Sequence, residues 1–120
     1  MLLKDKLHSL AHPSDMLSQA CGGGKVKCLA CAHGCVLALD AAGVCRMRFN
    51  RNGRLHVPFG YIGGAAVDPI EKKPFYHFYP GEKAFSFGML GCNFRCEFCQ
   101  NWMTSQALKD SEAGHGIQSC

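Results

Sequence analysis

Seven of the nine cysteines in this 120-residue chain fall into two short clusters, and this spacing constrains the fold more than any other feature. The first cluster contains Cys28, Cys31, Cys35 and Cys45, and the second contains Cys92, Cys96 and Cys99. The N-terminal residues carry charges too early to form the apolar part of a signal peptide, which predicts a cytoplasmic protein. Because cytosolic thiols stay reduced unless a metal holds them, we expect these cysteines to bind metal rather than to form disulfides.

The composition leaves room for one small domain and disfavours several other classes of protein. Apolar residues make up 48% of the chain, but no apolar run approaches the roughly 18 residues that would span a bilayer. The formal net charge is +4, and the lysines and arginines are scattered rather than clustered. We therefore expect no membrane partner, and a nucleic-acid partner is disfavoured.

The chain divides into four segments, of which the first three precede the second cysteine cluster. Residues 1–24 have leucines at loosely helical spacing and are predicted to form a weakly packed lead-in that ends at Gly22-Gly23-Gly24. Residues 25–57 are interpreted as a Cys-rich metal-binding hairpin module, in which Asn52-Gly53 predicts a tight turn. Residues 58–83 are rich in proline and aromatic side chains, which predicts an extended connection pinned by its aromatics.

The fourth segment, residues 84–120, begins with a predicted strand. From Ala84 to Leu90 large side chains alternate with small ones, a period of two that gives one bulky and one small strand face. Gly91 ends this strand, and a helix is predicted to begin within residues 100–108. A small face is typical of a strand that lines a barrel.

The second cysteine cluster follows this strand directly with the spacing C-x3-C-x2-C. Three thiolates on one tight loop can each bind one iron of a 4Fe-4S cluster, which leaves the fourth iron open to a small molecule. A structural zinc site would require a fourth protein ligand, and the nearest further thiol is the distant Cys120. The spacing therefore favours an iron–sulfur cluster at Cys92, Cys96 and Cys99.

At these residues the sequence resembles the radical S-adenosylmethionine (SAM) superfamily, whose signature combines this spacing with an aromatic residue before the last cysteine, here Phe98. The surrounding motifs are similar to those of the AmmeMemoRadiSam system radical SAM enzymes, relatives of the pyruvate formate-lyase activating enzymes. These motifs are Asp68-Pro69-Ile70-Glu71-Lys72-Lys73-Pro74, Tyr76-His77-Phe78, Pro80-Gly81, Gly91-Cys92-Asn93-Phe94 and Cys99-Gln100-Asn101-Trp102. The resemblance covers about residues 26–107.

The resemblance implies an activating-enzyme-like oxidoreductase with a 4Fe-4S cluster at Cys92, Cys96 and Cys99. The cluster would bind SAM and, with an electron from a donor such as a flavodoxin or ferredoxin, cleave it reductively to a 5'-deoxyadenosyl radical. Phe98 would pack near the adenine of SAM or serve only as an apolar packing residue. The substrate is not identified by the sequence, and the resemblance allows a protein.

The fold implied by the resemblance is an α/β fragment. It combines the Cys-rich β-hairpin module with the first βα unit of a partial TIM-like radical SAM barrel. Such a barrel needs about 200 residues, so we expect this chain to be an N-terminal portion that is inactive alone. The alternative is a non-catalytic Cys-rich module in which both sites are structural or carry electrons.

The spacing of the first cysteine cluster is compatible with two kinds of metal group. Four thiolates at Cys28, Cys31, Cys35 and Cys45 can close a tetrahedral zinc site, which is slightly favoured, or can bind a second iron–sulfur cluster. With four thiolates available, His33 is expected to hydrogen-bond to a ligand rather than bind the metal itself. The two remaining cysteines, Cys21 and Cys120, are expected to be free thiols.

Overall fold

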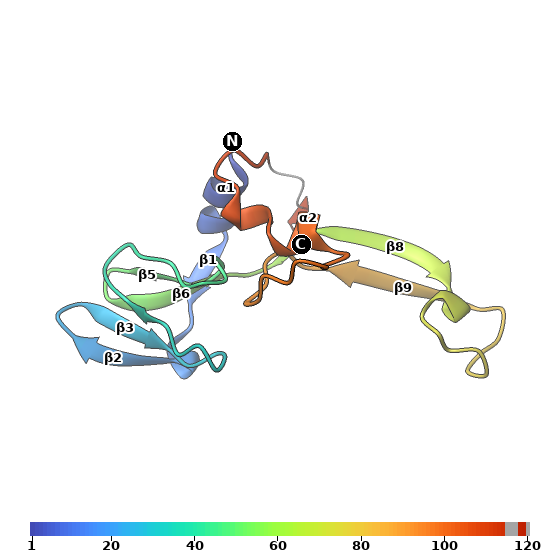
Figure 1. The fold of residues 1–120 in the computed structure, drawn as a ribbon, viewed down its shortest axis with the longest axis horizontal. Coiled ribbons are helices and arrows are strands. Elements are labelled where there is room, and N and C mark those ends of the chain that lie inside the picture. The colour runs from blue at the N-terminus through green and yellow to red at the C-terminus, as the bar shows by residue number, and fades with distance from the viewer. Residues whose placement is uncertain (115–117, 120) are drawn as a thin grey trace.

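The computed structural model describes residues 1–114 and 118–119 and shows an elongated α/β protein (Figure 1). Its radius of gyration is 16.8 Å, and its principal extents are 56 × 31 × 30 Å. A compact chain of this length would have a radius of gyration of about 14 Å. The difference arises from one long hairpin that projects away from the rest of the chain in Figure 1.

The helices and strands are short, and every strand pair in the described residues is antiparallel. The α-helices are α1 (Leu3–Ser9) and α2 (Trp102–Ser105), and the 3₁₀ helices are η1 (Asp15–Leu17), η2 (Ile70–Lys72) and η3 (Ala107–Lys109). The strands are β1 (Ala11–Pro13), β2 (Ser18–Gly22), β3 (Lys25–Cys28), β4 (Val36–Leu37), β5 (Phe49–Arg51), β6 (Arg54–Pro58), β7 (Tyr61–Ile62), β8 (Gly64–Pro69), β9 (Lys83–Gly88) and β10 (Gln118–Ser119). Within the described part of the chain, no helix has the length and apolar character to cross a membrane. The α/β class is confirmed, whereas the partial TIM-like barrel stays a prediction.

The first sheet, in the order β1-β6-β5, is built around the turn at Asn52-Gly53. β5 and β6 pair from Phe49 opposite His56 to Arg51 opposite Arg54. Asn52 and Gly53 have φ values of 55° and 76°, as the two-residue turn of a tight hairpin requires. The predicted hairpin is therefore confirmed.

The second sheet, in the order β2-β3-β4, joins the lead-in to the cysteine module. β2 pairs with β3 across Gly22-Gly23-Gly24, and all three glycines have positive φ. The triple glycine is thus a hairpin turn, and the sheet continues across the segment boundary expected there. Val26, Cys28 and Leu37 from this sheet form a buried core cluster with Leu55 of β6, so the two sheets pack together.

The helix α1 of the lead-in is well packed, so the expectation of weak packing was wrong for this part of the segment, whereas Met16 farther along it is 98% exposed. Leu3 and Leu7 of α1 are 3% and 1% exposed and form a second core cluster with Tyr61 of β7. The C-terminal segment covers the same helix, and the backbone N–H of Leu3 donates to the carbonyl of Ala113 at 3.0 Å. The apolar partners of α1 lie far along the sequence, where the local spacing of leucines gives no sign of them.

β8 and β9 form the projecting hairpin, which we call the arm (Figure 1). The strand predicted at 84–90 is confirmed as β9, and it pairs with β8 along its whole length, from Lys83 to Gly88. Val67, Phe85 and Phe87 share one face because Val67 lies opposite Phe85. Their side chains are 61%, 67% and 62% exposed, so the bulky face of the arm contacts solvent.

The connection at residues 58–83 is more regular and less pinned than predicted. It contains β7, β8 and η2. The aromatic residues near the tip of the arm are 56% to 65% exposed, namely Phe75, Tyr76, Phe78 and Tyr79. Phe78 contacts Phe75 and Tyr79 rather than a core, and the ring centroids of Phe78 and Tyr79 are 4.5 Å apart.

Candidate metal centre

The first cysteine cluster lies on the loops that leave the second sheet. Cys28 is the last residue of β3, Cys31 and Cys35 lie between β3 and β4, and Cys45 lies in the loop before β5. The N–H of Cys28 donates to the carbonyl of Cys35 at 2.8 Å, and the N–H of Gly34 donates to that of Cys31 at 3.2 Å. The backbone therefore turns sharply between the first three thiols.

These four cysteines line one cavity of about 270 Å³, which we call the thiol cavity. The remaining lining residues are Ala30, Gly43, Val44, Met47, Arg48, Gly91, Cys92 and Asn93. The structure thus brings the first cluster around a common space and adds one cysteine of the second cluster to it. Within residues 1–114 and 118–119, no three His, Cys, Asp or Glu side chains stand close enough together to hold an ion without rearrangement. Metal binding at this cluster stays a prediction.

Gly43 shapes the loop that carries Cys45. Its N–H donates to the carbonyl of Arg48 at 2.8 Å, and its own carbonyl accepts from the N–H of Arg46 at 2.9 Å. A Cβ at this position would lie 3.5 Å from Sγ of Cys35. The loop therefore passes closely over Cys35, which places Cys45 on the wall of the same cavity.

The second cysteine cluster lies on the loop that follows β9. Cys96 is exposed, whereas Cys92 and Cys99 are partly buried. The backbone N–H of Phe94 donates to Sγ of Cys92 at 3.4 Å, and Oγ of Ser105 lies 3.5 Å from Sγ of Cys99. Only Cys92 of this set lines the thiol cavity, so the structure does not gather all three thiols around one space.

The segment that follows the second cysteine loop holds the backbone of that loop in place. Nε2 of Gln106 and Nζ of Lys109 both donate to the carbonyl of Phe94, at 3.1 Å and 3.3 Å. The N–H of Gly91 donates to the carbonyl of Thr104 at 3.0 Å. The predicted helix is present as α2 followed by η3, and its function in the structure is to support the cysteine loop.

The other residues that the sequence singled out lie outside the thiol cavity or beyond the described residues. Nδ1 of His33 lies 3.7 Å from Sγ of Cys31, and its ring contacts Phe94 edge to face at 6.3 Å. His33 does not line the thiol cavity. Phe98 is 88% exposed, and Cys21 is an exposed free thiol. Cys120 lies outside the described residues.

The charged residues of the motif from Asp68 to Pro74 make their contacts at the tip of the arm, where the chain passes from β8 toward β9. Asp68 accepts hydrogen bonds from Lys72 at 3.0 Å and Lys73 at 3.5 Å, and these contacts lower the pKa of its carboxyl group. Glu71 accepts a hydrogen bond from the N–H of Gly81 at 2.7 Å, which lowers the pKa of Glu71. In the described residues, these side chains therefore close the turn between β8 and β9.

Sequence reasoning did not identify a second cavity of about 670 Å³ next to the thiol cavity. It shares Gly43, Val44 and Asn93 with the thiol cavity. Its cationic lining residues are Arg46, Arg95 and Lys109, and no carboxylate of the described residues lines it. These cations come from the loop before β5, the loop after β9 and the end of η3, so no local run of charge could have pointed to them.

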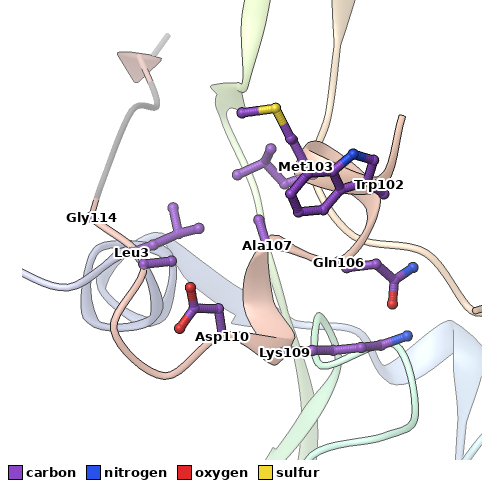
Figure 2. Close-up of a pocket in the computed structure, with 10 residues that line it drawn as sticks. Leu3, Trp102, Met103, Gln106, Ala107, Lys109, Asp110 and Gly114 are labelled. Atoms are coloured by element: carbon purple, nitrogen blue, oxygen red, sulfur yellow. The ribbon is translucent and has the colours of Figure 1, made fainter. Parts of the chain in front are cut away.

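A third cavity, of about 490 Å³, is largely apolar, and no cysteine of the described residues lines it (Figure 2). Figure 2 shows Leu3 and Gly114 on one side of it and Trp102 and Met103 on the other. Trp102 and Met103 are 63% and 72% exposed. This cavity therefore presents apolar surface beside the segment that supports the cysteine loop.

The chain is similar to an uncharacterized protein of Methanocaldococcus jannaschii, MJ0808. The two are 46% identical over 87 residues, which is 72% of this chain and 26% of the relative. The chain thus spans about a quarter of the length of the curated relative that it matches. No protein-family model and no solved structure matches the chain.

Proposed function

We propose that this chain carries the SAM-binding iron–sulfur loop of a radical SAM enzyme, with Cys92, Cys96 and Cys99 as the cluster ligands. The observation that supports this most directly is the set of donors around the loop sulfurs. Phe94 N–H donates to Cys92 Sγ, and the hydroxyl of Ser105 lies beside Cys99 Sγ. Donors at ligand sulfurs stabilise the thiolate form and tune the metal group that it binds.

The residues of the chain would contribute binding and orientation. The three thiolates would each hold one iron, and a cluster bound there would supply the electron for reductive cleavage of SAM. Gln106 and Lys109 would keep the loop backbone fixed through the carbonyl of Phe94. The exposed ring of Phe98 would offer an apolar face to the adenine.

We further propose that β9 is the first strand of a partial TIM-like barrel. In the described residues β9 pairs only with β8, which leaves its other edge open, and the bulky face of the arm is exposed. Further strands and helices of a barrel would cover the open edge of β9 and the bulky face of the arm. A flavodoxin or ferredoxin as electron donor, and a protein as substrate, belong to the same proposal for the whole enzyme.

Anaerobic reconstitution with iron and sulfide tests the cluster assignment. The reduced protein should give a 4Fe-4S electron paramagnetic resonance signal, and SAM should change the g-values because it binds the open iron. Cys96→Ala and Cys99→Ala should each remove the SAM-sensitive signal, whereas the matched variant Cys21→Ala should keep it. A SAM-sensitive signal that survives in Cys92→Ala/Cys96→Ala/Cys99→Ala would overturn the proposal.

A non-catalytic module is the second candidate, and one observation favours it. Cys92 lines the same cavity as the first cysteine cluster, an arrangement that would also suit two adjacent structural or electron-carrying sites. SAM binding separates the two candidates. Equilibrium dialysis of reconstituted protein with radiolabelled SAM should show binding that depends on Cys96 if the enzyme proposal is right, and none if the module is non-catalytic.

A further inference from the structure

The thiol cavity contains a cationic donor that lacks a partner. Arg48 lies three residues after Cys45 and is one of the residues that line the cavity. Its Nη1 atom is buried and has no hydrogen-bond partner among the described residues. The ion pairs of the described chain join other cations, Arg54 to Asp15 and Lys72 and Lys73 to Asp68. A guanidinium is always charged, so a buried N–H of this kind calls for an acceptor.

The walls of the thiol cavity offer Arg48 no anionic partner other than sulfur. Besides the five cysteines, the lining residues are small or apolar except for Arg48 and Asn93, and no carboxylate is among them. Four thiolates bound to a zinc ion, or to a 4Fe-4S cluster in its oxidised state, both carry a net charge of about −2. A metal–thiolate group in this cavity would therefore be anionic, and Arg48 would offset part of its charge and donate to its sulfur.

The size of the cavity and the spread of its thiols favour one of the two kinds of metal group. The cavity is about 270 Å³, and no three His, Cys, Asp or Glu side chains of the described residues stand close enough together to hold a single ion. A zinc ion lies about 2.3 Å from each of its four sulfurs, and those sulfurs leave no space between them. An iron–sulfur cluster places several irons and sulfides between its ligands and fills such a space.

We infer that the thiol cavity binds an iron–sulfur cluster rather than a single zinc ion, through Cys28, Cys31, Cys35 and Cys45, and that Arg48 donates an N–H to a sulfur of that cluster. This reverses the slight preference for zinc that spacing alone gave. The inference does not depend on the proposed SAM-binding loop, because it needs neither Cys96 nor Cys99. Arg48 is in this view a positioning and charge-compensating residue, not a catalytic one.

The test of the metal uses Cys92→Ala/Cys96→Ala/Cys99→Ala, in which the second cluster cannot form. The variant is reconstituted anaerobically with iron, sulfide and equimolar zinc, desalted and analysed. About four irons and four sulfides per chain, with a reduced-state resonance signal that SAM does not change, are expected. One zinc per chain without sulfide, or no bound metal, would overturn the inference while leaving the SAM-loop proposal untouched.

The role of Arg48 is tested in the same background by the midpoint potential of the cluster. Arg48→Gln should make the potential more negative, because the lost cation stabilises the reduced, more negative cluster. Arg48→Lys, which keeps the charge, should remain close to the parent and gives a measurement if the glutamine variant does not fold. Arg46→Gln is the matched control, since Arg46 is exposed on the same loop and does not line the thiol cavity. Equal potentials for Arg48→Gln and Arg46→Gln would contradict the assigned role.

Discussion

Gly91 packs against the side chain of Met47 so closely that any larger residue at this position would require Met47 to move. A Cβ built on Gly91 would lie 2.8 Å from Sδ of Met47 and 3.7 Å from the carbonyl oxygen of Cys45. Met47 also packs against the core cluster of Leu3, Leu7 and Tyr61. This contact fixes how the second cysteine loop approaches the loop of the first, because Gly91 directly precedes Cys92.

Gly91→Ala should destabilise the protein by about 2–4 kcal/mol, since it adds an overpacked contact to backbone strain. The strain arises because Gly91 has φ of 90°, a conformation that alanine adopts poorly. Urea denaturation of reduced, metal-free protein, followed by the fluorescence of Trp102, measures the effect. Gly60→Ala is the control, since Gly60 has φ of 68° and open space around its Cα. A loss no larger than that of the control would show that Met47 yields without cost.

Asn50 joins both sheets through its buried side chain, and Asn50→Ala should cost about 2–4 kcal/mol. The residue is 0% exposed. Its Nδ2 donates to the carbonyls of Gly24 at 2.7 Å and Leu37 at 3.0 Å, which the substitution would leave without a donor. The free energy of unfolding from urea titration should show the loss. Asn101→Ala, at an exposed position, should change it by less than about 0.5 kcal/mol, and equal values for the two variants would contradict the bridging role.

The local features of this fold could be predicted from the sequence, and the long-range ones could not. The Asn52-Gly53 turn and the β9 strand depend on residue conformation and on a period of two, which neighbouring residues determine. The packing of α1 depends on Tyr61 and on residues between Ala107 and Ala113. These residues are distant in the sequence, so no local pattern predicts their contact with α1.

In the candidate site, too, local features could be predicted from the sequence and long-range ones could not. The grouping of Cys28, Cys31 and Cys35 follows from their spacing, and the cavity contains all three. The presence of Cys92 in that cavity depends on the contact of Gly91 with Met47, which joins segments more than forty residues apart. The sequence likewise could not predict that Nη1 of Arg48 is buried without a hydrogen-bond partner, because burial depends on the tertiary structure.

The buried phenol of Tyr61 should make the protein less stable at alkaline pH. Burial raises the pKa of Tyr61 above its ordinary value of 10.0, although a backbone hydrogen bond from Leu90 opposes the shift. The unfolded chain therefore loses this proton first, so stability is unaffected below about pH 10 and falls as the pH rises toward the folded pKa. Tyr61→Phe should show a shallower loss of stability than wild type between pH 10 and 11.5.

The comparison with Tyr76→Phe isolates this effect from other alkaline titrations. Tyr76 is 63% exposed, so its substitution should leave the pH dependence unchanged. The measurement is the urea midpoint at each pH. Parallel curves for wild type and Tyr61→Phe would show that Tyr61 does not contribute to alkaline unfolding.

Removal of the metal group from the thiol cavity should lower the melting temperature sharply. Its ligands come from the end of β3 and from the loops before β4 and β5, so a bound group would tie the two sheets together. A ligand that binds only the folded state adds its binding free energy to stability, and each kcal/mol corresponds to roughly 4 °C for a domain of this size. We expect a loss of more than about 8 °C when reconstituted Cys92→Ala/Cys96→Ala/Cys99→Ala is stripped with an iron chelator and dithionite. Adding Cys45→Ala should abolish the difference and adding Cys21→Ala should preserve it, whereas identical melting of loaded and stripped protein would show that the four cysteines hold no stabilising group.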